Sequence, residues 1–378
     1  MTSVVNPQLA MQQSGFVEWN EPDRRRQSLR RLRDLARHGL TIRAPRVRML
    51  PKAIDPRIGR LERFARLSAD DAFSAVVVVR DGLIVHERYA ADFRPGQLHS
   101  IMSLSKTSMA LAVGTQWSEG KIDLSGRIGD LIPEIGSAYA DATVQQVLDM
   151  NWSNDYSEDF ADPASDVWRH EWVAGWRVLD EEPPPLREFL ASFGGGRPNT
   201  SGKIDYKDAN TDVLAWVVES VSGRSIREHV RELAEAAGIE GTMFIGCDRT
   251  FLPIVSFCIS LTALDLARWG MLLLDGKGVD GQQVGDRSFI DAAKTNPGTA
   301  FRLDERLPED WHYSNHLMSN GRWVGHLGYA GQWLAVDHET GTVLVWFSVL
   351  ESISGMEDEY HADLYQTADD LFTLLSED

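Results

Sequence analysis

The sequence predicts a mixed α/β (α+β) fold, in which an antiparallel sheet flanked by helices carries a mostly helical inserted domain. Three observations predict this arrangement. Apolar, β-branched runs occur near residues 73–89, helical patterns dominate from about 103 to 250, and strand patterns return between 322 and 348. Because strand patterns lie on both sides of the helical block, we expect the two terminal segments to share one sheet.

The composition is that of a globular protein with a large core, since 43% of the 378 residues are hydrophobic and 25% are charged. The formal net charge of −18 argues against nucleic acid and anionic membranes as partners, because both favour clustered Lys and Arg. No apolar run reaches the roughly 18 residues of a membrane-spanning helix. With two cysteines, Cys247 and Cys258, and no export-signal pattern at the N-terminus, we expect a cytoplasmic protein.

Residues 1–50 are predicted to form an irregular leader that contains one arginine-rich block, residues 24–33. Such a block can be a nucleic-acid or targeting patch. The interleaved Leu29, Leu32 and Leu35 favour a second interpretation, an amphipathic helix that packs on the surface through its leucines.

The rest of the chain is predicted to form two domains with the active site between them. A discontinuous sheet domain comprises residues 51–102 and 251–378, and a mostly helical domain comprises residues 103–250.

A β-hairpin is predicted where the sheet begins, because the apolar runs 73–79 and 83–89 flank the turn residues Asp81-Gly82. Further strands are expected at 322–326, 332–337 and 342–348. Helices are expected at 103–119, 143–150, 211–221, 261–274 and 360–375. The stretch 151–180 is long, aromatic and acidic, and it is either a functional lid or a solvated loop.

Ser103-Leu104-Ser105-Lys106 is the first candidate for catalytic chemistry. Ser103 and Lys106 are three residues apart, so they share a face if this segment is helical. A lysine of lowered pKa next to a serine can accept the hydroxyl proton and activate the serine as a nucleophile. The same spacing also occurs by chance in capped helices with a surface lysine, so it needs support from other residues.

Other catalytic patterns are absent from the sequence. No serine has glycine at both positions of a Gly-x-Ser-x-Gly motif, and no Gly-rich phosphate loop is present. His312 and His316 have the spacing of a zinc motif but lack its acidic residue. We therefore expect no metal and no cofactor.

Two later features could complete a site around Ser103. Tyr206 precedes a predicted buried helix and could act as an acid or base, although an ordinary half-buried tyrosine is the simpler interpretation. The segment 325–332 is rich in glycine and could present backbone N–H groups to an oxyanion, or it could be a plain hairpin.

The order Ser-x-x-Lys, tyrosine and glycine-framed strand resembles the serine hydrolases with a penicillin-recognising fold, the β-lactamase/DD-peptidase-like group of class C β-lactamases, DD-peptidases and related esterases. Within this group the chain is most similar to the hydrolases of 6-aminohexanoate oligomers. The similarity runs from about residue 70 onward and includes the segments 147–150, 162–165, 174–177, 209–216 and 265–268.

This resemblance implies the roles of the site residues. Ser103 would form the acyl-enzyme, Lys106 would shuttle its proton, and Tyr206 would protonate the leaving group. The backbone N–H groups of Ser103 and Tyr329 would hold the oxyanion. Asn210 would help bind the substrate, as the asparagine of a lengthened version of the Tyr-x-Asn motif.

Departures from the family pattern narrow the expected substrates. His326-Leu327-Gly328 replaces the Lys-Thr-Gly of β-lactamases, and leucine cannot bind the carboxylate of the antibiotic. Phe160 stands where the linear-amide hydrolases have a tyrosine, so amidase activity should suffer more than esterase activity. Glu171 lies near an acidic position that receives the ammonium end of their substrates. The expected substrate-binding residues are therefore Asn210, Phe160, Glu171, His326 and Gly328.

The resemblance implies a serine hydrolase of small carboxylic esters and of short linear amides such as 6-aminohexanoate oligomers. The alternatives are a weak β-lactamase or D-amino-acid peptidase, and a non-catalytic ligand-binding protein on the same fold. The expected partner is a small ester or amide, with no nucleic acid and no membrane. The sequence leaves a homodimer open as the assembly.

Overall fold

The computed structural model describes residues 19–160, 162–177, 179, 181–296, 298–301, 311–352, 355 and 358–377. The strands in this part of the chain are β1 (Gly39–Ile42), β2 (Phe73–Arg80), β3 (Leu83–Tyr89), β4 (His99–Ser100), β5 (Trp152–Ser153), β6 (Arg197–Pro198), β7 (Met243–Gly246), β8 (Ile259–Leu261), β9 (Thr299–Ala300), β10 (His312–Ser314), β11 (Leu317–Ser319), β12 (Val324–Gly328), β13 (Gln332–Asp337) and β14 (Thr342–Ser348).

The helices are α2 (Pro22–Arg30), α3 (Leu32–Leu35), η1 (Ile58–Arg60), α4 (Glu62–Leu67), η2 (Met102–Lys106), α5 (Thr107–Ser118), α6 (Ile128–Leu131), α7 (Val144–Leu148), α8 (Asp166–Val173), α9 (Leu186–Ala191), α10 (Asp208–Ser222), α11 (Ile226–Ala237), α12 (Ala263–Asp275), α13 (Arg287–Thr295) and α14 (Asp358–Ser376). No helix in the described ranges is long and apolar enough to cross a membrane.

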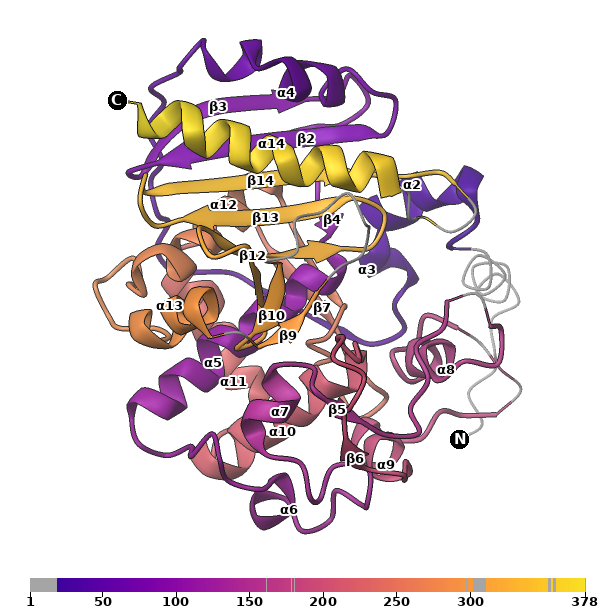
Figure 1. Cartoon of the computed structure of the whole chain (residues 1–378). Helices are drawn as coiled ribbons and strands as arrows, with labels where there is room; N and C mark the ends of the chain where they lie inside the picture. Colours follow the sequence, from indigo (N-terminus) through magenta and orange to yellow (C-terminus); the bar gives the residue numbers. More distant parts are fainter. Residues whose placement is uncertain are drawn as a thin grey trace.

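The main sheet has eight strands in the order β3-β2-β14-β13-β12-β11-β10-β9 (Figure 1). β2 pairs with β14 in antiparallel register, with Val79 opposite Val343, which confirms that the two terminal segments share one sheet. The predicted hairpin is also confirmed, because β2 and β3 pair on either side of Asp81 and Gly82, which both have positive φ.

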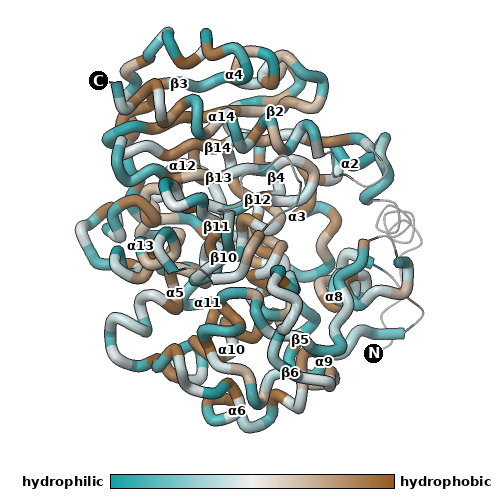
Figure 2. Tube along the Cα trace, viewed as in Figure 1, coloured by the Kyte–Doolittle hydropathy of each residue, from teal (hydrophilic) through white to brown (hydrophobic). Residues whose placement is uncertain are grey.

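The central strands are apolar on both faces because helices cover both faces of the sheet. Val77 and Val79 of β2 pack in the core on the side of α12, whereas Val76 and Val78 pack with the side chains of α14. Each buried valine contributes about 1.5–3 kcal/mol of burial free energy, so the continuous apolar run favours an interior position for β2, between β3 and β14. Figure 2 shows the contrast between the apolar α12 and the hydrophilic α2.

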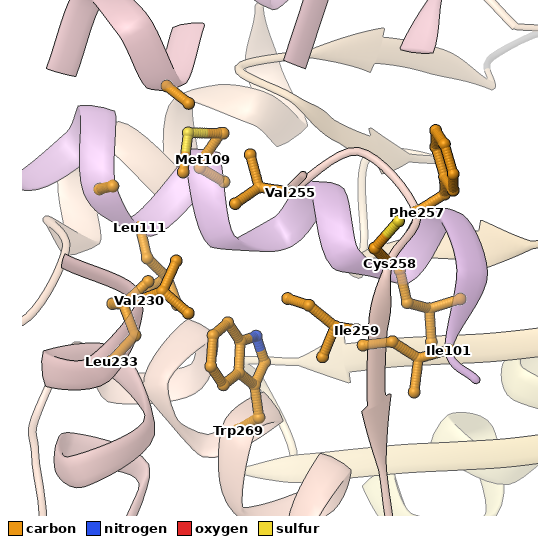
Figure 3. Close-up of a cluster of buried hydrophobic side chains, with 14 of the residues drawn as sticks. Ile101, Met109, Leu111, Val230, Leu233, Val255, Phe257, Cys258, Ile259 and Trp269 are labelled. Atoms are coloured by element: carbon orange, nitrogen blue, oxygen red, sulfur yellow. The ribbon is translucent and has the colours of Figure 1, made fainter. Parts of the chain in front are cut away.

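A second, four-stranded sheet has the order β1-β7-β8-β4 and holds the segment that leads into η2. The core beneath it contains Ile101, Ile259 and Trp269 (Figure 3). The Trp269 Nε1–H donates to Thr107 Oγ1 at 3.1 Å. Packing and this buried hydrogen bond therefore anchor the start of α5.

The leader prediction is confirmed in its helical part, is wrong in calling the rest irregular because residues 39–42 form β1, and lies partly outside the described residues, which begin at residue 19. The arginine-rich block forms α2 and α3, with Leu29 and Leu32 buried and Leu35 half-buried, as the amphipathic interpretation predicts. The buried Arg25 donates from Nη1 to Leu350 O at 2.5 Å and ties this helix to the segment that follows β14. The predicted domain boundaries stay a prediction.

Three sequence expectations need correction. The helix expected over 103–119 is split into η2 and α5. The loop expected over 151–180 contains α8. The sequence interpretation also omitted α11, although Ser225 and Glu228 form a complete capping box at its start and Gly238 ends it in a left-handed conformation.

Candidate active site

Ser103 lies in η2, directly after the short strand β4. The residue before it, Met102, has φ of 48°, a left-handed conformation that costs about 1–3 kcal/mol for a non-glycine residue. In a 3₁₀-helix residues i and i+3 eclipse each other, so Ser103 and Lys106 are brought together even more directly than in an α-helix. Ser103 is half-buried, whereas Ser105 is buried and its Oγ accepts from Ile259 N at 3.2 Å.

The Lys106 ammonium group is fully buried and has three acceptors for its three hydrogens. Nζ donates to Ser103 Oγ at 3.0 Å, to Asp208 Oδ1 at 2.5 Å and to the carbonyl of Ser256 at 3.0 Å. Asp208 is the ion-pair partner of Lys106 inside the site.

Tyr206 lies against this pair, with its ring centroid 4.9 Å from Lys106 Nζ. Its hydroxyl is buried and makes no hydrogen bond of normal geometry with any described residue, although it is near enough to Ser103 for that hydroxyl to lower its pKa. Burial has the larger effect and, with the charges of Asp208 and Glu158, raises the pKa of Tyr206 well above its usual range. Tyr206 is thus a protonated phenol at neutral pH.

Helix α10 positions the cluster through two aspartates on one face. Asp208 in its first turn pairs with Lys106, and Asp212 lies one turn later. Asp212 Oδ1 accepts from Val255 N at 2.9 Å, and its Oδ2 accepts from Ser256 Oγ at 2.5 Å. Asp212 therefore fixes the turn whose carbonyl group accepts from Lys106.

Glu158 adds a further carboxyl group from the loop before α8. Its Oε2 accepts from Asp208 N at 2.5 Å, so it caps the start of α10. The residue is half-buried as a whole, but its Oε1 is inaccessible and makes no hydrogen bond within the described part of the chain. Burial, together with the charge of Asp208, raises the pKa of Glu158 well above its ordinary value, and Lys106 only partly opposes this effect.

A pH dependence of stability follows from Glu158. Above its ordinary pKa of 4.5, the unfolded chain has lost this proton while the folded chain still holds it. The free energy of unfolding should therefore fall as pH rises through this window, by up to about 1.4 kcal/mol per pH unit. We expect Glu158→Gln to make this fall shallower in urea unfolding between pH 5 and 8.

The exposed Glu188→Gln is the matched control and should leave the pH slope unchanged. Carboxyl groups that do not contact Glu158 contribute equally to wild type and variant, so the difference between the two slopes reports Glu158 together with its neighbour Asp208. If the free energy of unfolding falls with pH as steeply in Glu158→Gln as in the wild type, Glu158 does not hold a proton in the folded protein.

The candidate oxyanion site forms where β12 ends against η2. A Cβ atom at Gly328 would lie 2.6 Å from the carbonyl oxygen of Ile101, so glycine permits this close approach. Ala330 has φ of 64°, so it is left-handed like Met102, the residue before Ser103. No backbone hydrogen bond outside the helices and strands engages Ser103 N or Tyr329 N in the described part of the chain, so both stay candidate oxyanion donors.

Aromatic side chains border this end of β12. The Phe160 ring stacks on Tyr329, with centroids 6.0 Å apart, and packs edge-on against Trp168 at 5.6 Å. Phe160 remains 49% exposed. The stretch 151–180 therefore reaches the candidate oxyanion site through a residue that a substrate can contact.

Three predicted binding residues have other partners in the structure. The Asn210 side chain accepts from Tyr139 Oη at 2.8 Å and donates to Met150 Sδ, rather than contacting Ser103, Lys106 or Tyr206. The residue two positions after Tyr206, where the Tyr-x-Asn motif has its asparagine, is Asp208. Asn210 as a substrate-binding residue stays a prediction.

His326 and Glu171 are also engaged within the protein. His326 is buried, with Nδ1 2.6 Å from Leu327 O and Nε2 3.0 Å from Tyr313 Oη, and burial lowers its pKa well below the usual range. It is a neutral neighbour of the Tyr206 ring rather than a cation. Glu171 Oε2 accepts from Arg177 Nε at 2.6 Å, so an internal cation already balances its charge.

The two histidines considered as metal ligands have separate partners. His312 Nε2 lies 2.7 Å from the carbonyl of Ala293, and His316 Nε2 lies 2.9 Å from Thr211 Oγ1. Among the residues that the structure describes, no group of three or more His, Cys, Asp or Glu side chains could hold a metal ion.

The chain is similar to known proteins over most of its length. The family model described as Beta-lactamase matches residues 69–369. The chain is 33% identical over 349 residues to the 6-aminohexanoate-dimer hydrolase of Paenarthrobacter ureafaciens, which covers 87% of this chain and 86% of the relative.

Solved structures show the same fold. A candidate 6-aminohexanoate-dimer hydrolase from Bacillus anthracis superposes with a TM-score of 0.80 at 23% identity, over 95% of this chain and 96% of that chain. A family VIII carboxylesterase superposes with a TM-score of 0.61 at 16% identity, over 85% of this chain and 99% of that chain.

Proposed function

The chain belongs to the beta-lactamase family and is a hydrolase, and on this premise we propose that it cleaves small carboxylic esters through an acyl-enzyme on Ser103. We propose short linear amides as slower substrates. The observation that carries the proposal is the set of three hydrogen bonds from Lys106, which hold the ammonium group 3.0 Å from Ser103 Oγ.

The proposed first step moves one proton through Tyr206. Ser103 Oγ attacks the substrate carbonyl carbon and passes its proton to Tyr206 Oη, while Tyr206 gives its own proton to the leaving group. The phenol is never required to ionise fully, which fits its raised pKa. The ammonium group of Lys106 stabilises the negative charge that develops on Ser103 Oγ during attack.

The second step reverses this path with water. A water molecule gives a proton to Tyr206 Oη as its oxygen attacks the acyl carbon, and Tyr206 returns a proton to Ser103 Oγ as the carboxylic acid leaves. In both steps the carbonyl oxygen becomes an oxyanion, for which the N–H groups of Ser103 and Tyr329 are the proposed donors.

Ester preference rests on Phe160 and Leu327. An amine is a poorer leaving group than an alkoxide and gains more from an extra donor, which the ring of Phe160 cannot supply. Leu327 has no polar group for the carboxylate of a β-lactam. The test is a side-by-side panel of short p-nitrophenyl esters, 6-aminohexanoate dimer and a chromogenic cephalosporin.

We expect the esters to have the highest kcat/KM, the dimer a lower value and the cephalosporin the lowest. Fast cephalosporin turnover would favour a β-lactamase instead. Binding of these compounds without turnover would favour a non-catalytic binding protein.

Phe160→Tyr is expected to restore a hydroxyl group near the leaving group. We expect kcat/KM for 6-aminohexanoate dimer to rise about tenfold, because one hydrogen bond to a developing charge is worth about 1.5–3 kcal/mol. Hydrolysis of p-nitrophenyl acetate should change by less than about twofold, since p-nitrophenolate is already a good leaving group and gains little from a second hydrogen-bond donor.

Phe251→Tyr is the matched control, because Phe251 is similarly exposed but packs against His38. The account of Phe160 is wrong if Phe160→Tyr raises ester and amide hydrolysis equally, or if Phe251→Tyr has the same effect.

A further inference from the structure

A crevice of about 240 Å³ lies between the arginine-rich helices and the segment that precedes β4. Its lining includes Arg30, Arg31, Arg33, Asp34 and Ser260, and none of the candidate catalytic residues. Figure 1 shows α2 and α3 beside β4, which α2 contacts. The volume is many times what one water molecule needs, so a small organic or inorganic ion fits.

The crevice is positively charged in a chain whose net charge is −18. Arg31 Nε lies 3.0 Å from Asp34 and Arg33 Nε lies 3.5 Å from the same carboxylate, so two cations share one anion. Arg30 pairs with Asp92, outside the lining. The lining therefore has an excess of positive charge that an anion would balance.

Two buried polar groups of the lining lack a partner. Ser260 is 2% exposed, and its Oγ makes no hydrogen bond with any residue that the structure describes. Arg30 Nε is also buried and unpaired within the same ranges. A hydroxyl and a guanidinium N–H are both donors, and buried donors without an acceptor are uncommon in folded proteins. An oxygen of an anion in the crevice would supply the acceptor that both donors lack, once the two side chains turn toward it.

We propose that this crevice binds a small oxyanion, a carboxylate or phosphate group, held by Arg31, Arg33, Arg30 Nε and Ser260 Oγ. Arginine suits this role because its planar donors match the geometry of both groups. A carboxylate can come from the products of ester or amide hydrolysis, and a phosphate cannot. The proposal does not rest on the proposed function.

The site is directly linked to the segment that carries Ser103. Ser260 lies opposite Ser100 in the pairing of β8 with β4. Its neighbour Ile259 accepts from Ile101 N at 2.9 Å and donates to Ser105 Oγ at 3.2 Å. An anion that accepts a hydrogen bond from Ser260 would therefore contact β8, the strand that pairs with β4 and supports η2.

The test is calorimetric titration at low ionic strength with inorganic phosphate and, separately, with hexanoate, in the absence of substrate. We expect saturable binding of at least one anion by the wild type. Arg31→Gln/Arg33→Gln should weaken it about tenfold or more, and Ser260→Ala should weaken it severalfold. Tighter binding of phosphate identifies a phosphate site, and tighter binding of hexanoate identifies a carboxylate site.

Arg46→Gln/Arg57→Gln removes the same charge from exposed positions outside the crevice and should bind the anion as the wild type does. The proposal fails if neither anion shows saturable binding, or if both double variants weaken binding equally. If Ser260→Ala does not fold, the comparison of Arg31→Gln/Arg33→Gln with Arg46→Gln/Arg57→Gln still tests the proposal, because all four arginines are exposed. Anion binding is measured without hydrolysis. A failure of the anion proposal can therefore be told apart from a failure of the proposed esterase function.

Discussion

Ser103→Ala is expected to reduce hydrolysis of p-nitrophenyl acetate by about 10³-fold or more and to abolish labelling by a fluorophosphonate probe. The variant removes the atom that forms the covalent bond, while Lys106 keeps its hydrogen bonds to Asp208 and Ser256. Folding should therefore be preserved, which circular dichroism and thermal unfolding can check.

Ser105→Ala is the matched control, since it removes a hydroxyl group two residues away. Ser105 Oγ accepts from Ile259 N, so its loss should cost about 1–3 kcal/mol of stability and leave probe labelling intact. Labelling that persists in Ser103→Ala and disappears in Ser105→Ala would reassign the nucleophile.

Lys106→Met is expected to abolish esterase activity and to destabilise the fold by about 3–5 kcal/mol. The large cost arises because Asp208 would be left as a buried carboxylate next to Glu158, with no cation in contact with it. The stability change can be measured by urea unfolding at pH 7.

The double variant Lys106→Met/Asp208→Asn separates the two effects. Removing both charges should recover most of the lost stability, because no buried charge is then unpaired. Esterase activity should stay absent, because Ser103 still lacks the ammonium group. The assigned role of Lys106 is wrong if the double variant regains activity, and the ion-pair account is wrong if Lys106→Met is as stable as the wild type.

The sheet was predictable because its signals are local. The apolar runs at 73–79 and 342–348 could be buried on both faces only inside a sheet, and the Asp81-Gly82 turn fixed the first hairpin. The short strands β4, β7 and β8 have two to four residues each, too few for a periodic pattern. Their existence depends on pairing between distant segments.

The candidate site was predictable to a similar extent. The spacing of Ser103 and Lys106 is visible in the sequence, and the family resemblance supplied Tyr206. Asp208 and Glu158 were missed because their contacts join residues that are 102 and 50 positions apart. The position of Asp208, two residues after Tyr206, is a sequence signal that could have found it.

The most direct test of the central claim is mass spectrometry of the protein quenched within milliseconds of mixing with p-nitrophenyl acetate. The account predicts a burst of p-nitrophenol, one added acetyl group per chain, and an acetylated peptide whose modified residue is Ser103. A burst with acetyl on another residue, or steady turnover with no acetylated protein at any time, would contradict a Ser103 acyl-enzyme.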